Sequence, residues 1–257
     1  MRFDIIIKTF ERYNLLRNLL FSIQKYYPEC KIIIADDSFN FKRDFYKQFN
    51  LDIDVLYLGK DVGLSYGRNY AVSQSKNEYI LLLDDDFVFD ERTDIDKFIQ
   101  LADFLEADVV GGSLDTNGKI DGYNQILEMD GKTLYYKKNK NKVLQHKYIK
   151  YQKSDIVYNF GIFRTSLFKK HKWDENIKIK GEHTLFFKEG NRKGLKVYYC
   201  PDVTIQHNPK REGIYGKMRG RNEGLVYMYR KLKINKIINV NRQVTELIDN
   251  KFKTYRI

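Results

Sequence analysis

Cysteine and proline are scarce in this 257-residue sequence, and none of its apolar runs approaches the length of a membrane span. Cys30 and Cys200 are the only cysteines and lie far apart, which excludes a disulfide framework and a cysteine-based zinc site. A membrane-spanning helix needs about 18 or more consecutive apolar residues, which this sequence lacks. Because no signal-peptide pattern precedes the first β-branched run, we expect a cytoplasmic protein.

Charge is unevenly distributed along the chain, whose formal net charge is +12. Residues 1–130 hold 15 basic and 24 acidic side chains, whereas residues 131–257 hold 31 basic and 10 acidic ones. The acidic half suits a bound cation. The basic half suits phosphates, an anionic acceptor or an anionic membrane surface, and part of its excess is an ordinary solvated surface.

Strand and helix signals alternate over residues 1–115. Apolar runs of strand length cover residues 3–8, 31–35, 54–58, 78–83 and 108–112. Apolar residues at helical spacing cover residues 14–27, 65–74 and 93–106. This alternation predicts an α/β fold with a mostly parallel sheet flanked by helices.

The chain is expected to form one domain with an extension. Residues 1–222 are assigned to the domain, with a nucleotide-binding half over 1–115 and an acceptor and catalytic half over 116–222. Glycine, tyrosine and lysine are frequent over residues 116–158, which predicts twisted strands or an irregular insertion. Residues 223–257 are predicted to be a basic helical tail.

Three consecutive aspartates, Asp84, Asp85 and Asp86, interrupt an apolar stretch in the segment LLLDDDFVF, residues 81–89. Adjacent carboxylates repel one another and cannot all be buried without compensation. A buried strand that ends at a divalent cation resolves the conflict, because Mg²⁺ and Mn²⁺ favour oxygen ligands. An acidic, solvated turn after a strand is the alternative.

Polar residues follow three of the predicted strands. They are Lys8-Thr9, Asp36-Asp37 and the triple aspartate. Ligands bind outside the carboxyl ends of the strands in such sheets, so these side chains are expected along one rim.

Four motifs occur in order along the chain and together indicate a family. They are IKTFER at 7–12, GLSYGRN at 63–69, LLDDDF at 82–87 and EHTLFF at 182–187. Over residues 3–225 the chain resembles nucleotide-sugar glycosyltransferases of the GT-A fold in the inverting, family-2-like group. Within that group it is most similar to the β-1,4-N-acetylgalactosaminyltransferase type. Each motif alone is weak, whereas the ordered set is specific.

The resemblance implies a metal-assisted transfer from a UDP-sugar. Asp86, Asp84 and His207 would then hold the metal, with Mn²⁺ the first choice and Mg²⁺ the second, since imidazole suits Mn²⁺ better. Asp84 or Asp85 would also reach the ribose. A histidine in an ordinary surface loop is the alternative for His207.

The remaining donor contacts also follow from the resemblance. Thr9 and Asp36 or Asp37 would contact uracil and ribose, and Arg68 would approach the uracil or the diphosphate. Arg68 is equally suited to a salt bridge with a neighbouring aspartate. The basic residues expected to close over the diphosphate are Lys217, Arg219 and Arg221.

Inversion requires a general base that takes the proton of the acceptor hydroxyl. Relatives carry an acidic tripeptide at the start of a helix, usually ending in Asp, where this chain reads Gly181-Glu182-His183. Glu182 is the first candidate for the base and His183 the second, since its ordinary pKa lies near neutral pH. Candidates for stacking against an acceptor are Trp173, Phe186 and Phe187, although such aromatics more commonly belong to a core.

The function that the resemblance implies is transfer of GalNAc from UDP-GalNAc to a glycan or lipid-linked acceptor, and the basic half of the chain suggests a role in surface polysaccharide synthesis. The tail is expected to contact an anionic membrane surface peripherally or a second copy of the chain. A sugar-phosphate nucleotidylyltransferase is the first alternative, but residues 8–12 lack the glycine-rich phosphate loop of that class. A nucleic-acid-binding protein is the second, but the chain has no recognised module for it.

Overall fold

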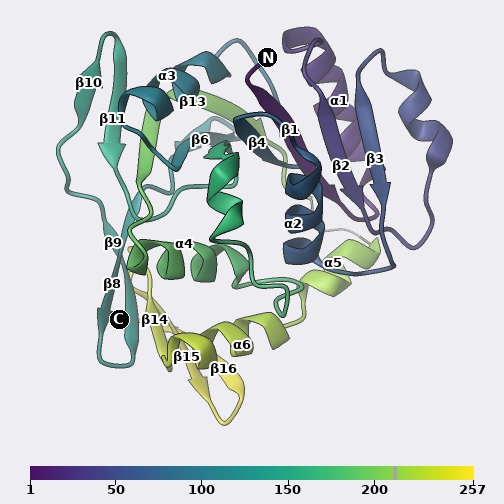
Figure 1. Ribbon diagram of the computed structural model, residues 1–257. Coiled ribbons are helices and arrows are strands. Elements are labelled where there is room, and N and C mark those ends of the chain that lie inside the picture. The colour runs from purple at the N-terminus through teal and green to yellow at the C-terminus, as the bar shows by residue number, and fades with distance from the viewer. Residues whose placement is uncertain (211–212) are drawn as a thin grey trace.

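The computed structural model describes residues 1–210 and 213–257, and it has the expected α/β architecture (Figure 1). The large sheet is ordered β10-β11-β13-β6-β12-β4-β1-β2-β3, with β5 on β13 and β7 on β6. A smaller sheet is ordered β16-β15-β14-β9-β8. No helix in the described part of the chain is long and apolar enough to cross a membrane.

The elements of the amino-terminal half match the predicted alternation. They are β1 Phe3–Thr9, α1 Tyr13–Tyr26, β2 Ile32–Asp36, the 3₁₀ helix Arg43–Gln48, β3 Ile53–Tyr57, α2 Leu64–Gln74, β4 Tyr79–Asp84, β5 Phe87–Val88, α3 Ile95–Phe104 and β6 Val109–Thr116. Strands β3, β2, β1 and β4 are mutually parallel, as predicted. Beyond β4 the sheet is mixed, because β12 runs antiparallel to both β4 and β6.

The rest of the chain contains more strand than helix. Its elements are β7 Lys119–Asp121, β8 Gln125–Asp130, β9 Thr133–Lys138, β10 Leu144–His146, β11 Ile149–Lys153, β12 Gly161–Arg164, the 3₁₀ helix Thr165–Lys169, α4 Glu182–Arg192, β13 Val197–His207, α5 Gly213–Arg219, α6 Glu223–Leu232, β14 Lys236–Ile238, β15 Gln243–Ile248 and β16 Lys251–Arg256. Strands β12 and β13 enter the large sheet, so both halves of the domain share it.

The prediction of a helical tail is wrong beyond Leu232. Strand β14 pairs in parallel with β9, and β15 and β16 continue the small sheet from it. Pairing with a hairpin about a hundred residues earlier gives this segment its strand conformation. Helix α6 packs on the small sheet, where the Tyr229 ring lies 5.2 Å from the Phe252 ring.

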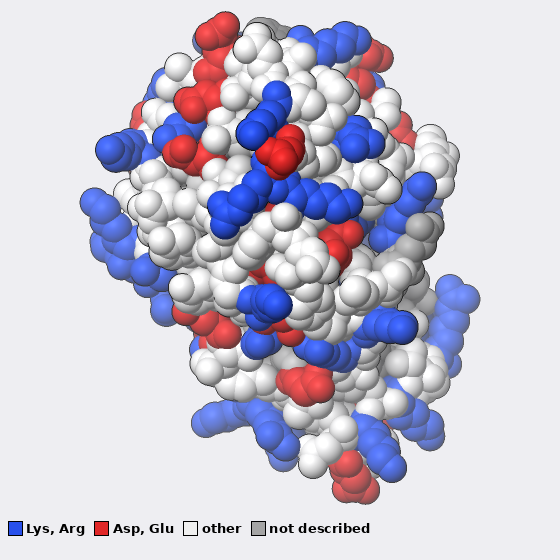
Figure 2. Space-filling view, turned by 90° about the vertical axis from the view of Figure 1, so that its right-hand side faces the viewer, with Lys and Arg blue, Asp and Glu red and all other residues white. Residues whose placement is uncertain are grey.

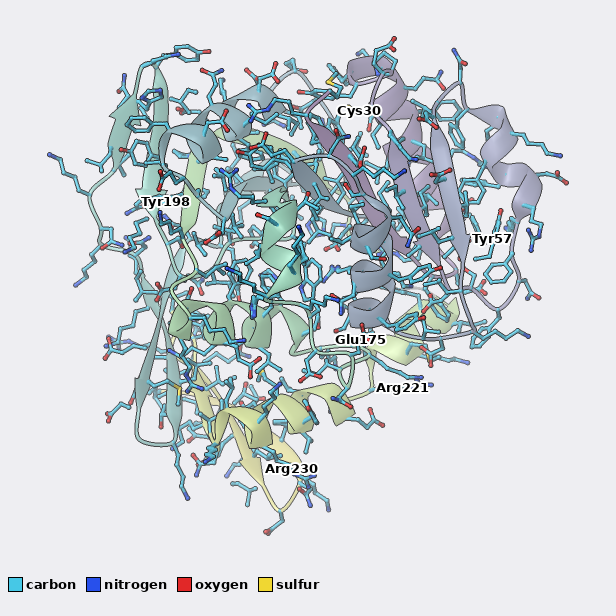
Figure 3. The ribbon with its side chains drawn as sticks, in the orientation of Figure 1. Cys30, Tyr57, Glu175, Tyr198, Arg221 and Arg230 are labelled. Atoms are coloured by element: carbon cyan, nitrogen blue, oxygen red, sulfur yellow. The ribbon has the colours of Figure 1, made fainter. Side chains whose placement is uncertain are left out.

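Helices cover both faces of the large sheet, which gives three layers (Figure 1). Side chains of β1 alternate between two cores, with Ile5 and Ile7 against α1 and α3, and Ile6 against α2 and α4. Such a doubly covered sheet explains why the central strands are apolar without alternation. Cys30 and Cys200 are buried free thiols, and Cys30 lies near the start of the chain in Figure 3.

Candidate active site

A cavity of about 520 Å³ opens at the carboxyl ends of β1, β2 and β4. Its walls also include the end of β13, the start of α4, and α5. Its size is that of a small-molecule site, which typically spans about 300–1,000 Å³. Of the residues predicted to bind donor or metal or to act as the base, all except Asp36 and Lys217 line this cavity.

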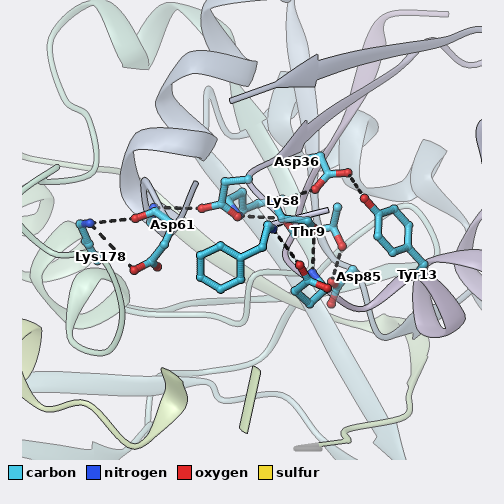
Figure 4. Close-up of polar contacts among 12 residues, drawn as sticks. Lys8, Thr9, Tyr13, Asp36, Asp61, Asp85 and Lys178 are labelled. Carbon is cyan, nitrogen blue, oxygen red and sulfur yellow. Dashed lines mark hydrogen bonds and ion pairs between the residues drawn. The ribbon is translucent and has the colours of Figure 1, made fainter. Parts of the chain in front are cut away.

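Asp36 and Asp37 point in different directions. Asp37 forms a buried ion pair with Lys8 and accepts a hydrogen bond from the Gly63 amide at 3.0 Å. Asp36 is fully buried, does not line the cavity, and accepts a hydrogen bond from the Tyr13 hydroxyl at 2.7 Å (Figure 4). Asp36 therefore braces the end of β2, and Asp37 alone faces the site.

The triple aspartate divides its carboxylates between two arginines. Asp85 and Asp86 each accept a hydrogen bond at 2.6 Å from Arg12, whereas Asp84 accepts one at 2.7 Å from Arg68. Asp85 and Asp86 are buried, and the Asp84 side chain is 37% exposed. The repulsion anticipated from the sequence is thus relieved by two cationic side chains of the chain itself.

The first group of contacts is termed the Arg12 network and comprises Arg12, Thr9, Asp85, Asp86 and His207. Burial raises the pKa of Asp85 to about 7 against the opposing effect of Arg12, and the Thr9 hydroxyl donates to it at 2.8 Å. Burial also acts to raise the pKa of Asp86, but His207 and Arg12 together hold it below its ordinary value. One carboxylate of the pair therefore stays ionised while its neighbour titrates near neutral pH.

His207 reaches Asp86 because β5 pairs with the end of β13, which sets His207 opposite Phe87. Its Nε2 lies 3.7 Å from Asp86 Oδ2, and its Nδ1 lies 3.0 Å from the Thr116 hydroxyl. A partner on Nδ1 fixes the ring and leaves Nε2 to face the carboxylate, as in many metal-binding histidines. The ordinary surface-loop alternative for His207 is therefore wrong.

The fit of a divalent cation rests on Asp86 and His207. No group of three or more His, Cys, Asp or Glu residues in the described part of the chain is arranged to hold a metal. Asp84 is engaged by Arg68 and by the Asn159 amide at 3.4 Å, so it does not complete such a group. Asp86 and His207 offer the oxygen and nitrogen types that Mn²⁺ takes as ligands, and a cation there would share Asp86 with Arg12, which donates to the same carboxylate oxygen at 2.6 Å.

The second group of contacts, the Arg68 network, comprises Arg68, Asp84, Glu182 and Asn159. Arg68 is fully buried, and its Nη1 lies 3.7 Å from Glu182 Oε1, at the first residue of α4. Its guanidinium lies 5.6 Å from the centre of the Trp173 ring. Trp173, Phe186 and Phe187 are at most 2% exposed, so they belong to the core beneath Arg68 and present no surface for an acceptor.

His183 lines the cavity beside Glu182, but its environment differs from that of a typical base. Burial, reinforced by the Arg68 charge, lowers the pKa of His183 to about 3. The Val157 backbone opposes this shift, but neither ring nitrogen makes a hydrogen bond of normal geometry within the described residues, and the ring packs edge-on against Phe187 at 5.0 Å. A histidine with this pKa is neutral near pH 7 and accepts a proton poorly.

Basic residues after β13 close one side of the cavity. Arg221 donates to Asp61 at 2.8 Å, at the junction of α5 and α6 (Figure 3), and Arg219 also lines the cavity. Tyr215 of α5 stacks on the Arg12 guanidinium at 4.2 Å. On the face shown in Figure 2, basic side chains are interspersed with acidic ones and do not form one continuous patch.

The cavity-lining residues that sequence reasoning missed include Arg12, Tyr123, Tyr158 and Asn159. Arg12 lies in the IKTFER motif just beyond β1, so the rule that ligands bind at strand ends pointed to it. The other three come from segments without a recognisable pattern, and only the fold brings them to the site.

Comparison with known proteins agrees with this architecture. Residues 4–172 match the Glycosyl transferase family 2 model. Beta-1,4 N-acetylgalactosaminyltransferase 1 of Mus musculus is 32% identical over 216 residues, and Beta-1,4 N-acetylgalactosaminyltransferase 2 of the same species is 31% identical over 215. These alignments cover 80% and 79% of this chain but only 39% and 38% of the relatives, so the chain spans about two fifths of their length.

Solved structures show the same fold. The crystal structure of S. aureus TarS 1-349 in complex with UDP-GlcNAc superposes with a TM-score of 0.61 at 20% identity, over 84% of this chain and 61% of that one. The structure of TarS 1-349 itself gives 0.60 at 19% identity, over 81% and 60%. The resemblance inferred from the four motifs is confirmed. The chain therefore belongs to glycosyl transferase family 2.

Proposed function

We propose that this chain transfers GalNAc from UDP-GalNAc to a hydroxyl of a glycan or lipid-linked acceptor, with inversion at the anomeric carbon. The observation that carries the proposal is the convergence of the Arg12 and Arg68 networks on one cavity at the carboxyl edge of the sheet. Relatives named as N-acetylgalactosaminyltransferases support GalNAc as the sugar, and a TarS structure holding UDP-GlcNAc supports a UDP-sugar donor.

The nucleotide would lie along the first two strands. Thr9 and Asp37 line the cavity there and offer a hydroxyl and a carboxylate to the uracil and ribose. Arg219 and Arg221 also line the cavity and suit the diphosphate, since guanidinium groups form charge-assisted bonds with phosphate oxygens. Asp86 and His207 would hold a divalent cation, which supplies Lewis-acid neutralisation of the leaving diphosphate when bound.

Glu182 is the proposed general base. Its carboxylate takes the proton of the acceptor hydroxyl while the acceptor oxygen forms a bond to the anomeric carbon. The bond between that carbon and the diphosphate oxygen breaks, and UDP leaves with the electron pair. Arg68 positions Glu182 and links it to Asp84, which couples the base to the donor side of the site. The low pKa of His183 favours Glu182 over its neighbour for this role.

Product analysis tests the reaction class. The purified protein is incubated with Mn²⁺ and each of UDP-GalNAc, UDP-GlcNAc, UDP-galactose and UDP-glucose, and the released nucleotide is identified. We expect UDP, fastest from UDP-GalNAc and diminished by EDTA. In a parallel incubation with UTP and a sugar phosphate, release of pyrophosphate, together with no UDP from any of the four donors, would establish the nucleotidylyltransferase instead.

We further propose that the chain works on surface polysaccharide at the cytoplasmic face of a membrane. Residues 223–257 carry eight Lys and Arg against three Asp and Glu, which supports peripheral contact with anionic lipid. Co-flotation with vesicles containing phosphatidylglycerol, lost at high salt, is expected. If the protein is a dimer in solution and does not co-float with vesicles, this surface instead contacts a second copy of the chain.

A further inference from the structure

Two tyrosines missed by sequence reasoning stack against each other on the wall of the cavity. The rings of Tyr123 and Tyr158 are 4.9 Å apart with an interplanar angle of 26°, and both line the cavity. They come from segments 35 residues apart, the turn after β7 and the loop before β12. Their pairing is therefore a product of the tertiary fold.

The Asp121 carboxylate contacts both members of the pair. Asp121 Oδ2 accepts a hydrogen bond from the Tyr158 hydroxyl at 2.8 Å, and Asp121 Oδ1 accepts one from the Tyr123 backbone amide at 3.1 Å. Tyr123 has a φ of 43°, in the left-handed region that non-glycine residues rarely adopt. Such conformations persist where the surroundings determine them, and they concentrate at ligand sites.

Unpartnered polar atoms lie next to this stack. His183, whose ring centre is 6.0 Å from that of Tyr123, has two buried nitrogens that make no hydrogen bond of normal geometry among the described residues. Asn159, adjacent to Tyr158, has a buried Oδ1 in the same condition, while its Nδ2 donates to Asp84. Buried polar groups are nearly always paired in native proteins, so these atoms lack the partner that a ligand would supply.

We infer that Tyr123, Tyr158, Asn159 and His183 form the subsite for the terminal sugar of the acceptor. A pyranose ring has a face of C–H groups and a rim of hydroxyls. The face packs on an aromatic ring, and the hydroxyls donate to Asn159 Oδ1 and to a His183 nitrogen. An aromatic surface with a few placed polar groups is the general form of such sites. The inference rests on the proposed glycosyl transfer.

Neighbouring contacts place this subsite beside the proposed base, Glu182. Asn159 and Glu182 both belong to the Arg68 network, and His183 follows Glu182 directly in the chain. Thr9, on the side proposed for uridine, belongs to the Arg12 network instead. A sugar on the tyrosine pair therefore lies beside the proposed base that its hydroxyl needs.

Substitutions that remove the rings test the subsite. Y123L and Y158L keep apolar bulk but lose the aromatic face, whereas Y158F keeps the ring and loses only the bond to Asp121. The probes are the methyl β-glycosides of galactose, GalNAc, GlcNAc and glucose, with UDP-GalNAc and Mn²⁺. UDP release without glycoside reports the donor side, the glycoside KM reports the acceptor side, and thermal unfolding confirms that each variant folds.

We expect Y123L and Y158L to raise the KM for the best glycoside about tenfold, with Y158F within threefold of wild type. UDP release without glycoside stays within twofold in all three. An unchanged glycoside KM in both leucine variants would overturn the subsite while leaving the proposed function intact. Saturation-transfer NMR measures glycoside binding directly and so detects the opposite outcome. Glycoside binding that depends on the tyrosines, with no UDP release from any donor, would refute the transferase and retain the subsite.

Discussion

Arg12 neutralises two buried carboxylates, and its removal provides the sharpest test of the electrostatics of this site. The Arg12, Asp85 and Asp86 side chains are only 7%, 4% and 9% exposed, and both ion pairs measure 2.6 Å. Removing one partner of a buried pair typically costs about 3–5 kcal/mol, because a charge is left without compensation. Asp85 has a pKa of about 7 and is only partly ionised at neutral pH, which places R12A at the lower end, about 3 kcal/mol.

The matched control is R2A. Arg2 also bridges two carboxylates, Glu78 and Asp103, at 2.5 and 2.6 Å, but its side chain is 47% exposed. Solvent-exposed pairs contribute about 0–1 kcal/mol, since water screens them and compensates the freed charge. Burial is therefore the main difference between the two variants.

Thermal unfolding without metal measures the difference. For a chain of this size about 2–4 °C accompany each kcal/mol, so R12A should unfold about 6–12 °C below wild type and R2A within about 4 °C. Mn²⁺ then replaces the missing cation at Asp86, and at about a hundred times its Kd it returns about 2.7 kcal/mol. Equal shifts in R12A and R2A, or no Mn²⁺ effect on R12A, would refute the reasoning.

Three further predictions concern α4 and its surroundings. E182Q should slow sugar transfer about 10²–10⁴-fold while UDP binding stays within twofold. The control is E189Q, on the same helix and paired with Lys231, which should leave transfer unchanged. Equal transfer rates in the two variants would show that Glu182 is not the base. H183N should shift no limb of the pH–rate profile between pH 5 and 8, because the pKa of His183 is about 3, and a lost limb would contradict this. Burial acts to raise the pKa of Asp174, but Lys231 and Asn176 hold this pKa below its ordinary value. The ionised Asp174 therefore stabilises the fold above about pH 4, and this stabilisation is lost as the pH falls through the pKa of Asp174 in the folded protein. The Tm of D174N should therefore approach that of wild type at low pH, and a constant difference between about pH 3 and pH 7 would exclude the linkage.

Local pattern is sufficient to predict the nucleotide half of the fold. Apolar runs of β1, β2 and β4 are buried on both faces and therefore read as strands without any knowledge of their neighbours. Parallel strands end at one edge, and this rule alone predicts that Thr9, Asp37 and the triple aspartate lie together. Pairing in the structure follows, with Lys8 opposite Asp84 and Thr9 opposite Asp36.

The tail defeats prediction from local pattern because its partner is distant in sequence. Strand β14 is short, and it is held in strand conformation by the pairing of Lys236 with Thr133 and of Ile238 with Tyr135 in β9. Context of this kind overrides local propensity, most strongly for β structure. Trp173 is a similar case, since the sequence carries no information about its 2% exposure and leaves acceptor stacking open.

The family, the α/β alternation and the acidic edge are predictable from the sequence, because they depend on residue types at fixed spacing along the chain. Which charged side chains pair with each other follows from the three-dimensional fold. Asp85 and Asp86 form ion pairs with Arg12, and Asp84 and Glu182 form ion pairs with Arg68. His183 is neutral beside two stacked tyrosines. Charge pairing, pKa and stacking depend on distance and burial in space, which residues far apart in sequence acquire only when the chain folds.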